Sequence, residues 1–379
     1  MPLDYDILRF IWWALLGVLL IGFAILDGYD LGTAMLLPFV ARTDAERRQA
    51  RETIEPHWEG HQVWFILGGG AAFAAWPLLY AVSFSGFYIA MFLVLMTLIL
   101  RPVGFTFRDK LEDPRWRAFW DWALAVGGFV PSLVFGVAFG NLLLGVPFGF
   151  DGEMHLSYGG TFFGLLNPLG LLAGLVSVAM LAMHGGAWLA VKADGLVAER
   201  AAQVVRFAGF AASVLFVLAG IWIAFGIDGY VIGGAMSHTG PSNPLAKSVA
   251  RETGAWMRNY GVHAALIAAP VLGIGGPLLA AVLSRPRGSV GALIASGVGV
   301  AGIIATAGVS LFPFLLPSST HPEASLTVWD ASSSPLTLFI MLIAVLVFLP
   351  VVLVYTSIVM RLMRGRVHLV DVERRQSHY

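Results

Sequence analysis

Long apolar segments alternate with short polar stretches along the whole chain. Nine of these segments reach roughly 20 residues or more, the length that a helix needs to cross the hydrocarbon core of a bilayer. The pattern therefore predicts an all-α polytopic membrane protein with nine transmembrane helices. The first and fifth segments exceed one crossing, so we expect tilt or projection beyond the lipid. The approximate limits are 8–38, 56–77, 79–104, 120–146, 161–190, 203–226, 260–284, 289–315 and 335–361.

The boundary between the second and third segments is the least distinct part of this pattern. The run from Val63 to Leu100 carries no charge. Only Trp76-Pro77 and the stretch Ser83–Ser85 suggest a tight turn, because proline and clustered serines interrupt helices. We therefore place the end of one helix and the start of the next close to this proline.

Composition supports the membrane class. Apolar residues make up 58% of the chain, charged residues 12%, and the mean hydropathy is +0.80. A soluble protein of this size needs far more charge. The chain has no cysteine, which excludes disulfides, thiolate metal sites and cysteine nucleophiles. The acidic start, with Asp4 and Asp6, argues against a cleavable signal peptide. We expect one integral membrane domain over 1–379, with halves at 1–150 and 160–379 and a cytoplasmic tail at 362–379.

Lysine and arginine test the number of spans independently. With nine spans, the basic clusters in 41–52, 105–119, 191–206 and the tail all fall on one side of the membrane. Short loops rich in these residues are typical of the cytoplasmic face. We therefore predict an N-terminus outside and a C-terminus in the cytoplasm, with membrane lipid around the chain. The formal net charge of zero gives no indication of nucleic-acid binding.

This topology places an acidic pair in the cytoplasmic half of the membrane. Asp27 and Asp30 lie in ILDGYDLG, about 27 Å below Arg9 at 1.5 Å per residue. Acids inside a membrane are costly and usually mark a pathway, so the functional interpretation is a proton-accessible pair. The alternative is a helix end that has already left the hydrocarbon, with both acids hydrated.

The second segment starts on the same side with His57, Glu59 and His61. Two imidazoles at i and i+4 share a helix face, which suits a metal ion, although the zinc-protease pattern needs Glu directly after the first His. No third ligand is evident nearby, so we assign no metal site and favour proton relay or plain hydrogen bonding. Glu59 is the best single candidate for a functional carboxylate.

The remaining candidate functional residues are two charged side chains, one tryptophan and isolated histidines. Arg101 ends the third segment and Asp121 begins the fourth, both on the cytoplasmic side. Arg101 either snorkels to the interface or neutralises an anion such as a carboxylate. Trp64 could line a passage for a small apolar molecule, although packing is the simpler role. Haem ligation would need His or Met pairs, and nothing pairs residues such as His184 and His263.

Eight stretches, in order almost from end to end of the chain, carry the most specific motifs. They are LRFIWWALLGVLLIGFAILDGYDLG at 8–32, EPHWEGHQVWFILGGGAAFAAWP at 55–77, FSGFYIAMFLVLMTLILRPVGF at 84–105, WDWALAVGGFVPSLVFGVAFGNLLLGVPF at 120–148, LLNPLGLLAGLVSV at 165–178, GIDGY at 226–230, AGVSLFPFLLPSST at 307–320 and SLTVWDASSSPLTL at 325–338. Together these motifs resemble subunit II of the cytochrome bd-type quinol oxidases, a family that includes the cyanide-insensitive branch.

The resemblance implies a function and a division of labour. It implies two four-helix bundles plus one peripheral helix in a bacterial cell membrane. The family oxidises quinol and reduces dioxygen to water with cytoplasmic protons, without pumping. Two haems b and one haem d belong to the haem-bearing subunit I, whereas subunit II scaffolds it and can hold a structural quinone. Small single-span accessory subunits are left open. By motif, Asp27, Asp30 and Glu59 belong to the proton route and Trp64 to an oxygen passage.

The same motifs place Arg101, Asp121 and His57 at the interface near the partner's haems. The chain departs from the family at two positions, because members carry Asp where this chain has Glu59 and Asn where it has His61. The longer carboxylate keeps the titrating group but moves it by about one methylene. A proton-coupled secondary transporter, using the same acids, is the alternative function.

Overall fold

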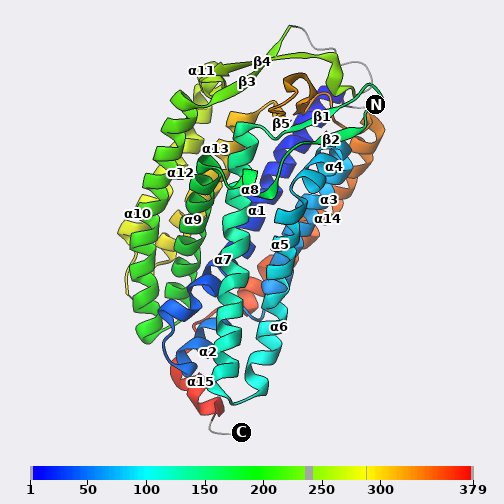
Figure 1. Ribbon diagram of the computed structural model, residues 1–379. Coiled ribbons are helices and arrows are strands. Elements are labelled where there is room, and N and C mark those ends of the chain that lie inside the picture. Colours follow the sequence, from blue (N-terminus) through cyan, green and yellow to red (C-terminus); the bar gives the residue numbers. More distant parts are fainter. Residues whose placement is uncertain (1–2, 235–241, 287, 377–379) are drawn as a thin grey trace.

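A computed structural model describes residues 3–234, 242–286 and 288–376. Within these ranges, eight helical segments are long and apolar enough to cross a membrane. They form an elongated bundle with the N-terminus near one end and the C-terminus at the other (Figure 1). The segments are α1 (Tyr5–Val40), Tyr88–Lys110, α7 (Pro114–Leu144), α9 (Pro168–Lys192), α10 (Gly195–Gly226), Ala264–Leu283, α13 (Val290–Leu311) and α14 (Pro335–Leu362).

The predicted second span corresponds to α3 (Trp58–Ala75), which is helical but is not among these eight. Its 18 residues begin with polar groups, including Glu59 and His61, so its average hydropathy is lower than that of the others. The polytopic helical class is confirmed. The ninth crossing stays a prediction.

The third predicted segment follows a turn at Trp76 and is helical in three consecutive pieces. Trp76 leaves helical geometry with φ −137° and ψ 79°, and α4 (Pro77–Gly86) forms a separate short helix with its proline at the first turn. This helix contacts strands β2 and β5 at the end of the bundle. The crossing follows as α5 (Tyr88–Leu98) and α6 (Leu100–Phe107). Backbone hydrogen bonds continue across the break between α4 and α5, from Phe87 N to Ser83 O and from Met91 N to Phe87 O. The segment that is long and apolar enough to cross runs from Tyr88 to Lys110, and the start of the crossing at residue 79 stays a prediction.

The observed starts of three helices differ from the predicted limits. The fifth segment is not over-long, because Asn167 caps α9 and separates it from the short α8 (Phe162–Leu165). Helix α10 starts at Gly195, eight residues before the predicted limit, and runs for 32 residues. Helix α7 starts at Pro114, after the cap Asp113. The expected length of the first segment is confirmed, since α1 has 36 residues and is about 54 Å long.

Close backbone contact holds the centre of the bundle together. Helix α1 packs against α3, α7, α9 and α13, while α9, α10, α12 (Ala268–Leu283) and α13 pack on one another. Where α1 crosses α9, a Cβ on Gly32 would lie 2.1 Å from the carbonyl oxygen of Leu181. Only glycine permits this approach, as is common between membrane helices. Helix α14 contacts α1 and α3 and lies at the edge of the bundle (Figure 1).

In the part of the chain that the structure describes, three two-stranded antiparallel pairs cover the end of the bundle that holds the N-terminus (Figure 1). The all-α prediction needs this correction. Outside the lipid a backbone can satisfy its polar groups in short strands as well as in helices. The pairs are β1 (Phe148–Phe150) with β2 (Leu156–Tyr158), β3 (Asp228–Gly233) with β4 (Ser248–Thr253), and β5 (Phe314–Leu316) with β6 (Leu326–Thr327).

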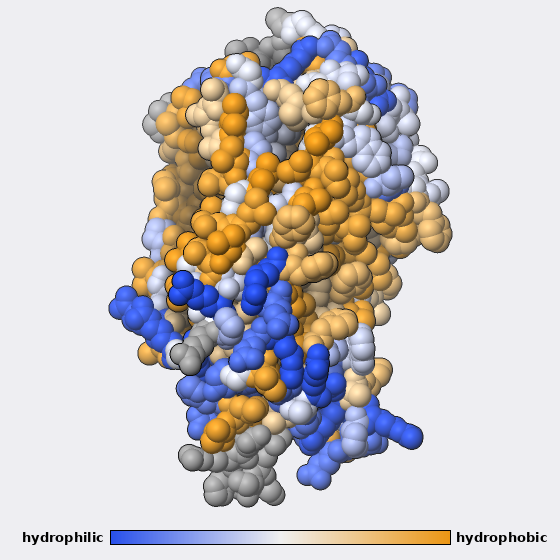
Figure 2. Space-filling view, turned by 90° about the vertical axis from the view of Figure 1, so that its left-hand side faces the viewer, coloured by the Kyte–Doolittle hydropathy of each residue, from blue (hydrophilic) through white to orange (hydrophobic). Residues whose placement is uncertain are grey.

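The surface pattern agrees with a bundle that crosses a membrane. Figure 2 shows a hydrophobic band across the middle of the molecule, with hydrophilic residues gathered at both ends. The end opposite the hairpins carries α2 (Asp44–Glu52) and α15 (Leu369–Gln376), which pack on each other. Of the predicted tail, the last three residues lie outside the described part of the chain.

Candidate functional site

Asp27 on α1 and Arg101 on α6 form a bidentate ion pair inside the bundle. Arg101 donates one nitrogen to each carboxylate oxygen, at 2.9 and 3.1 Å. Both side chains have an exposed fraction of 0%. The guanidinium also lies 5.6 Å from the ring centroid of Trp58. Such bidentate pairs fix the geometry of the two side chains as well as pairing their charges. Arg101 therefore neutralises a carboxylate of its own chain and does not snorkel.

Asp30, one turn further along α1, meets His57, the N-cap residue of α3, and His61 in the helix itself. Its Oδ2 lies 2.7 Å from Nδ1 of His61, and its Oδ1 lies 4.0 Å from Nδ1 of His57. The hydroxyl of Tyr29 lies 3.4 Å from the other ring nitrogen of His61. Tyr29 is held by stacking on Trp188, with ring centroids 4.0 Å apart. All five side chains are buried, so three helices close around one polar cluster.

Glu59 lies apart from these buried groups. It sits two positions from each histidine and so lies on a different face of α3, where it is exposed. It lines a cavity of about 300 Å³ together with Glu55, His57, His61 and residues of α14, including Met360. The cavity therefore connects an exposed carboxylate to the ring edges of the buried cluster.

Asp121 belongs to a second cluster, at the cytoplasmic-facing end predicted from the charges. It accepts from Arg108 Nε at 2.6 Å and from Arg47 at 2.9 Å. Arg108 also donates to Asp44 at 2.8 Å. Burial alone would raise the pKa of Asp44, but the guanidinium of Arg108 lowers that pKa below its usual range. The charges that the sequence grouped in one leaflet thus divide into two separate networks.

Trp64 is buried and packs against α1. A Cβ on Gly22 would lie 2.6 Å from its ring, so the indole fills the space that this glycine leaves. A large apolar cavity of about 540 Å³ lies nearby and is lined by Phe23, Phe65 and Phe135 among others. Trp64 is not among the described residues that line it. The oxygen passage at Trp64 stays a prediction.

The histidines considered as haem ligands have different surroundings. His184 is buried, and both of its ring nitrogens are engaged, with Ser296 Oγ at 2.7 Å and the carbonyl of Ile25 at 2.9 Å. It therefore pins α9 to α13 and α1. His263 is exposed near the start of the segment that leads into α12.

Sequence reasoning missed the meeting of Asp30 with His57 and His61. A signal was available, because the topology put both segments at the same depth and the two histidines share a helix face. It also counted Arg108 as a loop charge, although its side chain is fully buried beside Asp121. Only the fold brings Arg108, which the sequence places in a loop, next to Asp121 on α7.

The buried acids and histidines on three packed helices define a polytopic membrane protein with a polar site in its interior. Comparisons with known proteins identify it further. The profile of the family "Cytochrome bd terminal oxidase subunit II" matches residues 8–363. The chain belongs to this family.

The relatives agree along nearly the whole chain. The chain is 51% identical over 372 residues to the cytochrome bd-I ubiquinol oxidase subunit 2 of Escherichia coli K12, covering 98% of both chains. It is 31% identical to the cytochrome bd ubiquinol oxidase subunit 2 of Bacillus subtilis, covering 90% of this chain and 92% of that one. A chain in the structure of the bd oxidase from Geobacillus thermodenitrificans superposes with a TM-score of 0.69 at 15% identity, over 94% of this chain and 98% of that one. This structural similarity supports the helical fold described above.

Proposed function

We infer that the chain is subunit II of a terminal quinol oxidase in a bacterial cell membrane. The complex would oxidise quinol and reduce dioxygen to water. Family membership and the 51% identity to a ubiquinol oxidase subunit carry this inference. The eight apolar helices supply the membrane setting. Subunit II of such an oxidase implies a partner, the haem-bearing subunit I.

The number of haems and their location are part of this proposal. Two haems b and one haem d would sit in subunit I, and this chain would scaffold them. The engaged nitrogens of His184 and the absence of cysteine from the sequence support that division. Small single-span accessory subunits stay a prediction. We keep His57, Arg101 and Asp121 as residues facing the partner's haems only as a prediction, because all three are buried in this chain alone.

Nine crossings, with the N-terminus outside, complete the proposed topology. The 18 residues of α3 span about 27 Å, close to the hydrocarbon thickness of about 30 Å. Its close packing on α1 supports a full crossing. The bundles would then be α1, α3, α5–α6 and α7 on one side and α9, α10, α12 and α13 on the other. Helix α14 would be the peripheral ninth.

A proton route through Glu59, Asp30 and Asp27 is the most specific part of the proposal. The observation that carries it is the cavity in which exposed Glu59 lies beside the rings of His57 and His61, with Asp30 directly behind them. A carboxylate at the mouth can exchange protons with water, and buried acids along membrane helices commonly form relays. Asp27 follows one turn away on α1, held by Arg101.

Two further roles follow from the interior of the chain. The apolar cavity of about 540 Å³ has the size and lining of a site for a small hydrophobic molecule, and supports a structural quinone there. An oxygen passage past Trp64 would run along α3, beside this cavity.

Oxygen consumption by the purified two-subunit complex tests the proton route. We expect Glu59→Gln to lower quinol-dependent turnover by about tenfold or more, because the neutral amide cannot carry a proton. Glu59→Asp should restore most of the rate. The haem absorption spectrum should not change in either variant. Glu112→Gln, which removes an exposed carboxylate before α7, is the matched control and should keep the rate of the natural chain. An unchanged rate in Glu59→Gln would overturn the route.

A proton-coupled transporter is the competing function, favoured only by the same buried acids. Purification through a tag on this chain separates the two. The oxidase subunit should elute with a haem-absorbing partner in stoichiometric amount. A transporter should elute colourless and alone.

A further inference from the structure

We propose that Asp30, His57 and His61 form a binding site for a divalent transition-metal ion, with Zn²⁺ as the best fit. One ligand atom from each of these three buried residues lies within 4.8 Å of the other two. They come from α1 and from the start of α3, two helices that pack along each other. The site is separate from the haems, which the proposed function assigns to the partner.

The distances suit a tetrahedral ion. Zinc binds imidazole nitrogen and carboxylate oxygen at about 2.0–2.1 Å, so tetrahedral ligand atoms lie about 3.3 Å apart. The observed separations are 2.7 Å from Oδ2 of Asp30 to Nδ1 of His61 and 4.0 Å from Oδ1 of Asp30 to Nδ1 of His57. One donor atom from each of the three residues lies within 4.8 Å of the other two. A rotation of the Asp30 carboxylate would therefore bring one of its oxygens and both imidazoles into reach of a single ion.

Unsatisfied atoms point into the same space. Nδ1 of His57 and Oδ1 of Asp30 are buried and have no hydrogen-bond partner in the described part of the chain. An unpaired buried polar atom normally costs about 1–3 kcal/mol, so its presence calls for an explanation. A metal ion between the two atoms would satisfy both at once.

A supporting outer shell is already in place. If Nδ1 of His61 binds the ion, its other nitrogen carries the proton and can donate to the hydroxyl of Tyr29, now 3.4 Å away. Tyr29 is fixed in turn by its stacking on Trp188. Metal-bound histidines generally hold their second nitrogen in this way, which orients the ring.

The donor set selects the class of metal. Two imidazoles and one carboxylate suit Zn²⁺, whereas Mg²⁺ and Ca²⁺ prefer all-oxygen sites. The fourth position opens toward the cavity of about 300 Å³, where a water molecule can bind. Glu55 and Glu59 line that cavity and would offset the remaining positive charge. Access for the ion runs through the same opening.

A zinc ion bound at this site would also affect proton transfer, an effect that rests on the proposed function. A bound ion removes Asp30 and both rings from proton exchange, since their lone pairs are then used for coordination. Zinc would therefore slow oxygen consumption by closing the way from Glu59 to Asp27.

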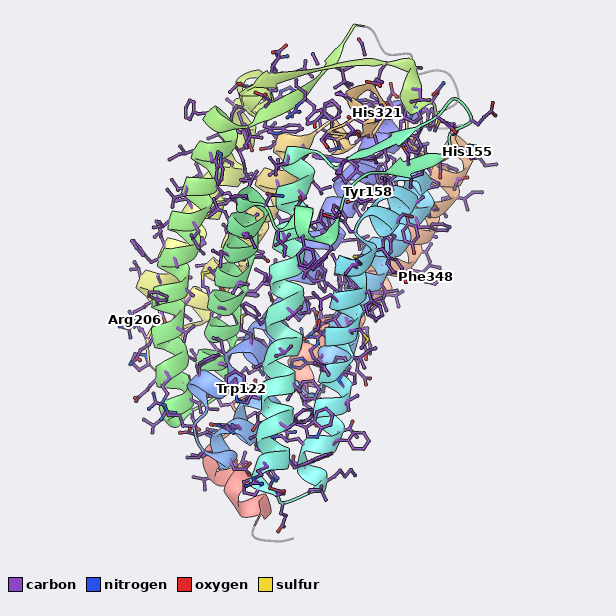
Figure 3. The ribbon with its side chains drawn as sticks, viewed as in Figure 1. Trp122, His155, Tyr158, Arg206, His321 and Phe348 are labelled. Atoms are coloured by element: carbon purple, nitrogen blue, oxygen red, sulfur yellow. The ribbon has the colours of Figure 1, made fainter. Side chains whose placement is uncertain are left out.

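Zinc binding to the purified complex tests the site directly. We would dialyse the complex against buffered Zn²⁺ and measure bound metal in the natural chain, in His61→Asn and in Asp30→Asn. Each variant should bind one zinc fewer per complex, or bind it at least about tenfold more weakly. Differences between variants cancel any zinc held by the partner. The matched control is His155→Gln, which removes an exposed histidine 2.9 Å from Asp151 at the hairpin end (Figure 3).

Equal zinc binding by the natural chain and both variants would overturn the proposal, as would a loss confined to His155→Gln. Unchanged haem spectra and elution establish that the variants are folded. X-ray absorption at the zinc edge of the natural complex is independent of the variants. It should show two imidazoles among four nitrogen or oxygen ligands, and fewer than two imidazoles would refute the site. Zinc that binds without slowing turnover would support the metal site and count against the proton route alone.

Discussion

The buried pair of Asp27 and Arg101 allows a quantitative prediction about stability. Arg101→Met removes the cation and leaves a carboxylate in a site with no exposed surface. Charges about 4 Å apart attract by about 4 kcal/mol at an effective dielectric constant of 20. Breaking a buried pair by removing one partner costs about 3–5 kcal/mol, which agrees. At about 2.1 cal/mol/K of unfolding entropy per residue, each kcal/mol shifts the melting temperature of a 379-residue chain by about 1.3 °C, so we expect a fall of at least about 4 °C.

Thermal melting of the detergent-purified complex at a fixed scan rate measures this effect, since membrane complexes generally unfold irreversibly. The double variant Asp27→Leu with Arg101→Met should recover most of the loss, because removing both charges leaves none unpaired. Arg258→Met is the control, since its partner Glu252 and Arg258 itself are about half exposed and such pairs contribute under about 1 kcal/mol. A single variant within about 1 °C of the natural chain would refute the reasoning. A double variant that melts no higher than Arg101→Met alone would refute it as well.

Two further predictions concern helix packing and the end of the bundle opposite the hairpins. Gly32→Ala should lower the melting temperature by several degrees, because its Cβ would lie 2.1 Å from the carbonyl oxygen of Leu181, whereas Gly17→Ala meets nothing within 4 Å and should be neutral. Burial alone would raise the pKa of Asp194, but its hydrogen bond with His368 lowers it. Its contribution to docking of the C-terminal segment is therefore complete at neutral pH and is lost as the pH falls through that lowered pKa. Asp194→Asn should expose this segment to limited proteolysis at neutral pH.

The apolar pattern predicted which stretches are helices better than it predicted where they begin. Length and hydropathy identified all eight segments that are long and apolar enough to cross within the described residues, because a bilayer leaves a chain few other ways to satisfy its backbone polar groups. The limits depended on local caps. Asn167 and Asp113 start α9 and α7 through side-chain acceptors that an average over many residues does not register. The turn at Trp76 was visible, but the extra helix after it depends on contacts with distant hairpins.

Candidate residues were easier to name than to connect. Their type and depth could be predicted, since an ionisable group in an apolar segment stands out. Their partners could not. Arg101 might equally have met Asp121 by depth alone, yet the rotation of α6 turns it toward Asp27, and Asp121 is held by Arg108 instead. Such choices depend on helix rotation and on loop geometry, which one sequence without its fold does not specify.

The three acids of the proposed route, Asp27, Asp30 and Glu59, differ in whether their carboxylate oxygens are available for proton exchange. Asp27 has both oxygens committed to Arg101, so any change there alters charge pairing and stability together. Asp30 keeps one oxygen without a partner in the described chain, and Glu59 is exposed on the cavity. A group that passes protons on needs a free lone pair and a neighbour to exchange with. Asp30 and Glu59 meet that requirement in the structure as it stands. Asp27 meets it only if Arg101 swings away, so loss of turnover in an Asp27 variant is evidence for the route only when the melting temperature is unchanged.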